Sequence, residues 1–251
     1  MSQRDEIVRY LDEFLHIATV DDISCNGLQV QGPVEVSKVG LAVDACMATY
    51  AKAADEGCGM LLVHHGLIWG GLKSLTGSTF AHVRYLIENG IGLYAAHLPL
   101  DRHPEAGNNV CLARLLGLSA VVPFGNYKGT DIGFAGVLPR RTTTDRIAGM
   151  LKEGLGGPVT SLPFGGRLNG TVGVVSGGGS DCLGEAIEKG IDCFVTGEPD
   201  HRDHHQALEG NLNVIYCGHY HSEQLGVKEV GRVLTQRFGV ETVFLDEPTL
   251  V

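Results

Sequence analysis

The chain has 251 residues, which is enough for one large or two small domains whose core needs neither a disulfide nor a metal to fold. Hydrophobic residues make up 43% of the chain and charged residues 19%, a globular composition that excludes a disordered scaffold. The net charge of −10 disfavours nucleic acid and anionic membrane surfaces as partners.

The sequence also restricts the compartment. No apolar run approaches the ~20 residues that cross a bilayer, and the opening residues MSQRDEIVRYLDEF lack the apolar region of a signal peptide. The seven cysteines are odd in number, scattered and never spaced C-x-x-C, which argues against a disulfide framework and a cysteine zinc site. We therefore expect a soluble cytoplasmic protein with reduced, buried thiols.

Short apolar runs alternate with helical patterns along the chain, which is typical of an α/β protein with mainly parallel sheets. In the first half, helices are predicted over 3–16, 46–56, 79–89 and 106–116. Strands are predicted over 38–43, 60–63 and 92–96. The stretch VVPFGNYKGTD, which contains proline and glycine, follows this half and predicts a boundary within 120–130. We expect one lobe over 1–125 and a second over 126–251.

The second half repeats the plan of the first. After a predicted strand at 132–138, a helix at 143–153 and the loop GGPVTSLPFGGRLNG, it offers the three strand motifs TVGVVSGGG, CFVTGE and VIYCGHYHSE. They correspond to KVGLAVDAC, MLLVHHG and GLYAAHLPLD in the first half. Ligands bind at the carboxyl ends of parallel strands, so two similar lobes facing one another predict a composite site in the cleft between them.

Two motifs of the first half place chemistry at these strand ends. His64 and His65 directly follow MLLV, and a pair of imidazoles suits two neighbouring metal ions, although one could cap the strand and the other lie at the surface. His97 and Asp101 frame HLPLD, where the alternative is a core histidine and a capping aspartate.

The motif CGHYHSE carries the strongest signal. It follows the strand VIY and opens a helix predicted to continue to about Phe238. His219 and Glu223 are four residues apart on one helical face and can approach the same ion, whereas His221 points elsewhere. The alternative is a serine cap with a glutamate favoured by the helix dipole.

These motifs together predict a dinuclear metal centre. Five nitrogen and oxygen ligands suffice for two ions if one carboxylate bridges them, and Glu223 is the natural bridge. Because no thiolate is among them, the candidate metals are Fe, Zn, Mn, Co and Ni. The predicted ligands are His64, His65, Asp101, His219 and Glu223.

The ordered motifs NGLQVQG, VHHGLIWGGLK, AAHLPLDRHPEAGNN, VSGGGS, VTGE and GHYHSE closely resemble the GTP cyclohydrolase I type 2 family, also called the Nif-three-like family. The resemblance extends from Asn26 to the helix after Glu223. It implies the same five metal ligands, two α/β lobes with the metal pair in the cleft, and a ring-shaped homohexamer.

Other segments are secondary candidates. Ser176-Gly177-Gly178-Gly179-Ser180 could cradle a phosphate with its backbone N–H groups, but a tight turn is at least as good an interpretation. His97 and Glu198 lie next to ligand motifs, and either could be an acid or base group. The run HRDHH at 201–205 is interpreted as a solvated turn and the start of a helix.

The leading hypothesis for function is a metal-dependent hydrolase. The resemblance implies GTP as the small-molecule substrate, attacked by water at C8 of the purine with release of formate. The same ligands suit another substrate, such as a phosphoester or a cyclic amide. The alternative outside catalysis is a metal-binding regulatory or scaffold protein, and the acidic charge disfavours a nucleic-acid clamp.

Overall fold

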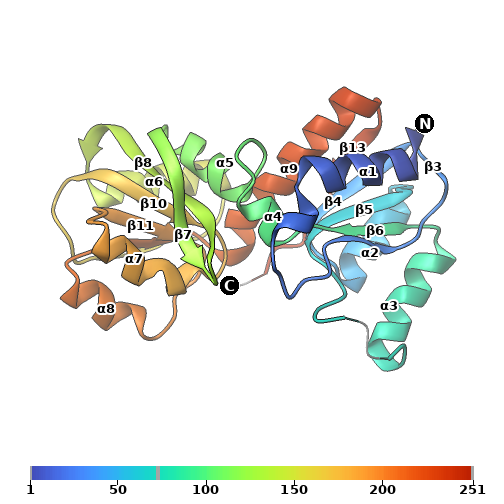
Figure 1. Ribbon diagram of the computed structural model, residues 1–251, viewed down its shortest axis with the longest axis horizontal. Helices are drawn as coiled ribbons and strands as arrows, with labels where there is room; N and C mark the ends of the chain where they lie inside the picture. The colour runs from blue at the N-terminus through green and yellow to red at the C-terminus, as the bar shows by residue number, and fades with distance from the viewer. Residues whose placement is uncertain (1, 72–73, 250–251) are drawn as a thin grey trace. The chain divides into compact units, whose positions relative to one another are not determined.

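The computed structural model describes residues 2–71 and 74–249, and their contacts form two compact units (Figure 1). Unit 1 consists of residues 2–100 and 227–248. Unit 2 consists of residues 101–226 and 249. Among the described residues, no helix combines the length and the apolar character that a bilayer crossing requires.

Unit 1 is built on a five-stranded sheet in the order β13-β4-β5-β6-β2. Four strands are parallel, namely β4 (Lys38–Asp44), β5 (Met60–His65), β6 (Gly92–Ala95) and β13 (Glu241–Phe244). The edge strand β2 (Gly27–Val30) pairs antiparallel with β6. The strands β4, β5 and β6 are the three apolar runs predicted in the first half, and the apolar side chains of these runs are buried.

The longer helices of unit 1 agree with the predicted ones, and the short elements were not predicted. The longer ones are α1 (Arg4–Phe14), α2 (Met47–Asp55), α3 (Gly77–Glu88) and the part of α9 (His219–Phe238) that follows Gly226. The shorter ones are β1 (Ser2–Gln3), a 3₁₀ turn (Ile17–Thr19), β3 (Glu35–Val36) and most of α4 (Leu98–Asp101). Buried residues of the helices and the sheet share one core, in which Ala53 and Leu86 join Leu61, Val63 and Leu93.

Unit 2 is built on a six-stranded sheet in the order β7-β8-β10-β11-β12-β9. Its strands are β7 (Ser119–Tyr127), β8 (Thr130–Thr142), β9 (Thr160–Pro163), β10 (Asn169–Val175), β11 (Cys193–Thr196) and β12 (Asn213–Tyr216). The strands β10, β11 and β12 are parallel neighbours, and the other three pair antiparallel. Both units therefore contain the predicted set of three parallel strands, and the α/β class is confirmed.

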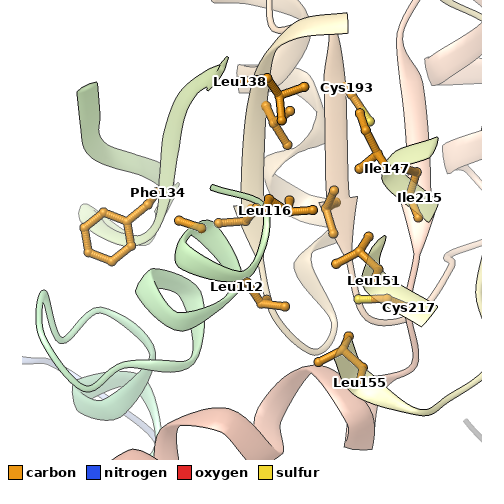
Figure 2. Packing of buried hydrophobic residues seen from close by; sticks show 14 of the residues in the cluster. Leu112, Leu116, Phe134, Leu138, Ile147, Leu151, Leu155, Cys193, Ile215 and Cys217 are labelled. Atoms are coloured by element: carbon orange, nitrogen blue, oxygen red, sulfur yellow. The ribbon is translucent and has the colours of Figure 1, made fainter. Parts of the chain in front are cut away.

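The helices of unit 2 are α5 (Asn108–Leu115), α6 (Thr144–Leu155), α7 (Leu183–Glu188), α8 (Asp203–Glu209) and the first turns of α9, with a 3₁₀ turn at Gly179–Cys182. Figure 2 shows their core, in which Leu112 and Leu151 pack with Ile215 of β12. Cys193 and Cys217 belong to this core, and burial raises the pKa of both thiols. They behave as small apolar side chains, as predicted. Cys58 and Cys182 are buried as well, whereas Cys25, Cys46 and Cys111 are partly exposed, which corrects the expectation that every thiol is buried.

The division of the chain differs from the predicted one at residue 125. The Pro- and Gly-containing stretch at 120–130 contributes most of β7, which pairs antiparallel with β8 as a strand of unit 2. The segment 101–125 therefore belongs to unit 2, together with Asp101. In the other direction, β13 pairs with β4, so the residues after Gly226 return to unit 1. The loop predicted after α6 also contains a strand, β9, at the sheet edge.

Candidate metal centre

The carboxyl ends of β4, β5 and β6 gather four polar side chains at one edge of the sheet of unit 1. Asp44 ends β4, His64 and His65 end β5, and His97 follows β6. Parallel pairing places Asp44 directly opposite His65 in register. This is the edge at which α/β proteins bind ligands.

Each imidazole of this edge is held through its Nδ1 atom. His64 is buried, and its Nδ1 lies 2.9 Å from the carbonyl oxygen of Ala96. A carbonyl oxygen can only accept, so Nδ1 of His64 carries the proton and Nε2 carries the lone pair that binds metals. His65 Nδ1 lies 2.9 Å from Oδ1 of Asp44, which gives the same orientation through a carboxylate.

His97 is held in the same way by Asp22, whose two oxygens both lie 3.0 Å from its Nδ1. The Asp22 side chain is only 2% exposed and also accepts hydrogen bonds from Asn26 Nδ2 and from the backbone N–H of Ser24 and Leu98. Burial raises the pKa of Asp22, but the hydrogen bonds and the charge of His97 outweigh burial and lower it to about 2. Ligand atoms of His64, His65 and His97 lie within 4.8 Å of one another and could hold a metal ion.

Unit 2 supplies the predicted carboxylates. Asp101 is buried, and its Oδ1 accepts hydrogen bonds from Asn108 Nδ2 and from Ser176 Oγ, both at 2.9 Å. Ser176 follows β10, and Asn108 begins α5. Two neutral donors thus fix the direction of a carboxylate that lies at the end of α4.

His219 and Glu223 share one face of α9, as predicted from their spacing. His219 Nε2 lies 3.1 Å from Glu223 Oε2, and His219 Nδ1 lies 3.1 Å from Glu198 Oε2. Burial lowers the pKa of His219, but Glu223 and Glu198 outweigh burial and raise it to about 9. His221 lies away from this pair, with its ring against Gly157.

The Ser176–Ser180 loop lies against the two predicted ligands of α9. Gly177 has φ +61°, and a Cβ atom built on it would lie 2.1 Å from Oε1 of Glu223. The backbone N–H groups of residues 176, 177 and 179 donate to side-chain oxygens of Asn109, Ser222 and Thr196, respectively. Because these donors are used within unit 2, the structure favours the tight-turn interpretation over a phosphate cradle.

Each unit offers donors of the kind that divalent transition metals bind. Unit 1 offers imidazole nitrogens whose orientation is fixed from behind, and unit 2 offers an imidazole and two buried carboxylates, Asp101 and Glu223. Buried carboxylates need compensating positive charge, and Glu198 and Glu223, which raise the pKa of His219, favour positive charge at this place in unit 2.

Sequence reasoning missed the residues that orient the ligands. Asp44 ends a predicted strand, so parallel pairing with MLLVHH was a usable signal for it. Asp22 and Asn108 carried no such signal, because they approach His97 and Asp101 from irregular segments and helix starts. Glu198, predicted as an acid or base group, lies against His219. Leu72 and Lys73, the last residues of VHHGLIWGGLK, lie outside the described residues.

Comparison with known proteins gives one consistent result. The family model Duf34/NIF3 (NGG1p interacting factor 3) matches residues 2–249. A protein of Archaeoglobus fulgidus named GTP cyclohydrolase 1 type 2 homolog is 46% identical over 97% of this chain and 98% of its own length. The equally named protein of Pyrococcus horikoshii is 47% identical over 98% of each chain. The crystal structure of TTHA1606 from Thermus thermophilus is 42% identical, covers 100% of both chains and has a TM-score of 0.87.

Proposed function

The chain belongs to the Duf34/NIF3 family, and from this premise we propose that it is a metal-dependent hydrolase holding two divalent transition-metal ions per subunit. The ions would supply Lewis acidity, which lowers the pKa of water and polarises the substrate. Fe, Zn, Mn, Co and Ni all suit these nitrogen and oxygen donors. The ligands in this proposal are His64, His65, Asp101, His219 and Glu223.

The orientation of the histidines carries this proposal. His64, His65 and His219 each have Nδ1 against an oxygen acceptor of their own unit, at 2.9, 2.9 and 3.1 Å. Metal-binding histidines almost always have such an acceptor behind the ring. The same arrangement is found at all three histidines that the sequence predicts as ligands. The proposal requires ligands of both units to meet at the same ions.

The proposed substrate follows the names of the relatives, and it is GTP. One water adds to C8 of the purine and opens the five-membered ring to a formamide. A second water hydrolyses the formamide, releasing formate and leaving an amine. His97 Nε2 is the group that we assign to proton transfer, because Asp22 fixes its opposite nitrogen. Glu198 instead orients His219.

Metal content and product analysis test this proposal together. Protein reconstituted separately with Fe, Mn, Zn, Co and Ni should retain about two ions per subunit for at least one metal. Incubation with GTP and a panel of nucleotides and phosphoesters, followed by mass spectrometry, should show formate and the ring-opened product. A stoichiometry well below two with every metal contradicts the dinuclear centre.

The alternatives have distinct outcomes in the same experiment. Hydrolysis of a phosphoester with no change to GTP would keep the hydrolase and change the substrate. Two tightly held ions without turnover of any substrate would favour a metal-binding regulatory or scaffold protein. We also propose a ring-shaped homohexamer in the cytoplasm, and a light-scattering mass near one chain would contradict the hexamer.

A further inference from the structure

The only tryptophan of the chain, Trp69, lies beside the imidazoles of unit 1. Its ring centroid is 5.1 Å from that of His97, in an edge-to-face arrangement, and 6.1 Å from that of His65. The indole N–H donates a 2.8 Å hydrogen bond to the carbonyl oxygen of Gly66. Despite these contacts, 39% of Trp69 remains exposed.

The segment that carries Trp69 is fixed by a second loop of the same unit. Gln29 Oε1 accepts hydrogen bonds from the backbone N–H of Leu67 at 2.7 Å and of Ile68 at 3.1 Å. Its Nε2 donates to the carbonyl oxygen of Cys25 at 2.7 Å. The backbone N–H of Cys25 in turn donates to Ile68 at 3.0 Å. Trp69 is therefore presented from a braced loop.

A second apolar side chain accompanies the indole. The backbone N–H of Gly70 donates a 2.7 Å hydrogen bond to Ile23, and Ser24 forms a β-bridge with Trp69. Ile23 is 64% exposed. We call Trp69 and Ile23 the apolar lip. A large aromatic ring held at the surface next to polar imidazoles offers stacking area, since its only polar atom is already bonded within the protein.

We propose that Trp69 is the stacking platform for a planar heteroaromatic ring of the substrate. The inference rests on the proposed hydrolase function and deepens it, because it favours a ring substrate over a simple phosphoester. Aromatic side chains stack on every nucleobase, since each base has a π-face. The imidazole of His97, edge-on to the indole, then stands beside the ring that is to be opened.

Intrinsic fluorescence tests the platform without any turnover. Because Trp69 is the only tryptophan, its emission reports on this one place. Guanosine and GTP, added to metal-loaded protein with excitation at the red edge of the tryptophan band, should quench the emission saturably. Ribose 5-phosphate and tripolyphosphate, which lack a π-system, should leave it unchanged. Saturable quenching by tripolyphosphate but not by guanosine would overturn the proposal, as would no saturable response to either nucleoside ligand.

Variants measured by equilibrium dialysis of guanosine make the assignment specific. Trp69→Leu should weaken binding about tenfold, within the range measured for loss of a stacked base, and Trp69→Phe should recover most of this loss. Phe80→Leu is the matched control, since Phe80 is a similarly exposed aromatic on α3 (47%). Equal affinities for wild type and Trp69→Leu would overturn the proposal.

The possible results distinguish a failure of the stacking proposal from a failure of the proposed hydrolase activity. Guanosine binding that depends on Trp69 but is followed by no hydrolysis leaves the platform in place and removes the activity. Hydrolysis of GTP with an unchanged KM in Trp69→Leu removes the platform and leaves the activity. If Trp69 emission changes with protein concentration and not with ligand, the apolar lip is an interface between copies of the chain, and the proposal fails.

Discussion

The two units contain the same three-strand parallel core and both place a carboxylate behind an imidazole, as Glu198 does for His219 in unit 2, but only unit 2 adds buried carboxylates among the predicted ligands. In unit 1, carboxylates lie behind the imidazoles, as Asp44 does for His65 and Asp22 does for His97. In unit 2, the predicted carboxylate ligand Asp101 is itself held by the neutral donors Asn108 and Ser176. A repeated strand plan therefore explains where the predicted ligands lie, while the residues around them determine which charge each unit carries at this edge.

We expect the largest loss of bound metal when the negative charge of Glu223 in unit 2 is removed. Glu223→Gln keeps the shape of the side chain. Because Glu223 is the proposed bridge, the variant should bind less of both ions, and metal affinity should fall more than about a hundredfold. The fold should persist, since glutamine keeps the size of the buried side chain and its amide oxygen can still accept a hydrogen bond from His219. Elemental analysis and circular dichroism measure the two effects.

His221→Gln is the matched control for Glu223→Gln, because His221 packs against Gly157 on another face of α9. Its metal content should equal that of the wild type. Loss of metal in His221→Gln together with retention of both ions in Glu223→Gln would reject the ligand assignment on this helix.

The next effect concerns the carboxylates behind the imidazoles of unit 1. Asp44→Asn keeps an acceptor for His65 Nδ1 but removes its charge, so metal affinity should fall about 10- to 100-fold. Competition with a chromophoric chelator measures this change. Asp55→Asn, at the exposed end of α2, should leave the affinity unchanged. Equal affinities in the two variants would mean that Asp44 does not act through His65.

Two glycine variants test whether the Ser176–Ser180 loop positions Glu223. Gly177 and Gly190 have φ of +61° and +65°, so alanine at either should cost about 1 kcal/mol of backbone strain. Only Gly177→Ala places a methyl group against Glu223, since nothing lies within 4 Å of the corresponding position at Gly190. Gly177→Ala should therefore also lower metal affinity by about tenfold, whereas Gly190→Ala should not. Similar metal binding by both would refute the supporting role of the loop.

The smallest expected effect is the pH dependence given by Asp22. Its pKa in the folded state is about 2, against 3.8 as the ordinary value, so its contribution is complete above the ordinary pKa. The contribution is lost as the pH falls towards the folded-state pKa and totals about 2 kcal/mol. The free energy of unfolding can be measured with urea at about pH 5 and about pH 3. Between these pH values, the stability of the wild type relative to Asp22→Asn should fall by roughly half of this total.

Asp21→Asn serves as the control for this pH dependence, since Asp21 is exposed on the same segment. It should follow the wild type at both pH values. A constant difference between the wild type and Asp22→Asn across this range would show that the buried carboxylate is not held in its charged form.

The central strands, and the polar residues that end them, could be predicted from the sequence for one physical reason. Buried parallel strands are continuous apolar runs, and histidines directly after such runs are easy to find, as in MLLVHH. The strand β7 was not predicted, because proline and glycine, here Pro123 and Gly125, usually interrupt strands. Its first five residues are also exposed, so they form no apolar run. At this edge the register shifts between Ser119 and Val122, and Ala120 has φ 49°.

The division into units could not be read in the same way. Apolar periodicity identifies a strand but not its partner, so nothing in ETVF shows that β13 pairs with β4, about 200 residues earlier in the chain. Apolar periodicity also does not predict the contacts by which Asp22 orients His97 and Asn108 orients Asp101. Ligand types at strand ends are therefore predictable, while the groups that aim them depend on tertiary packing.

The pairing of β13 with β4 also sets an order of events during synthesis. All six strands of the sheet of unit 2 have been translated when the ribosome reaches Gly226. The sheet of unit 1 still lacks β13 (Glu241–Phe244) at that moment, although its other four strands were translated first. Since domains fold as units while the chain emerges, the later-encoded unit can finish first. Until β13 is translated, the edge of β4 that it will cover remains unpaired and can pair with other strands.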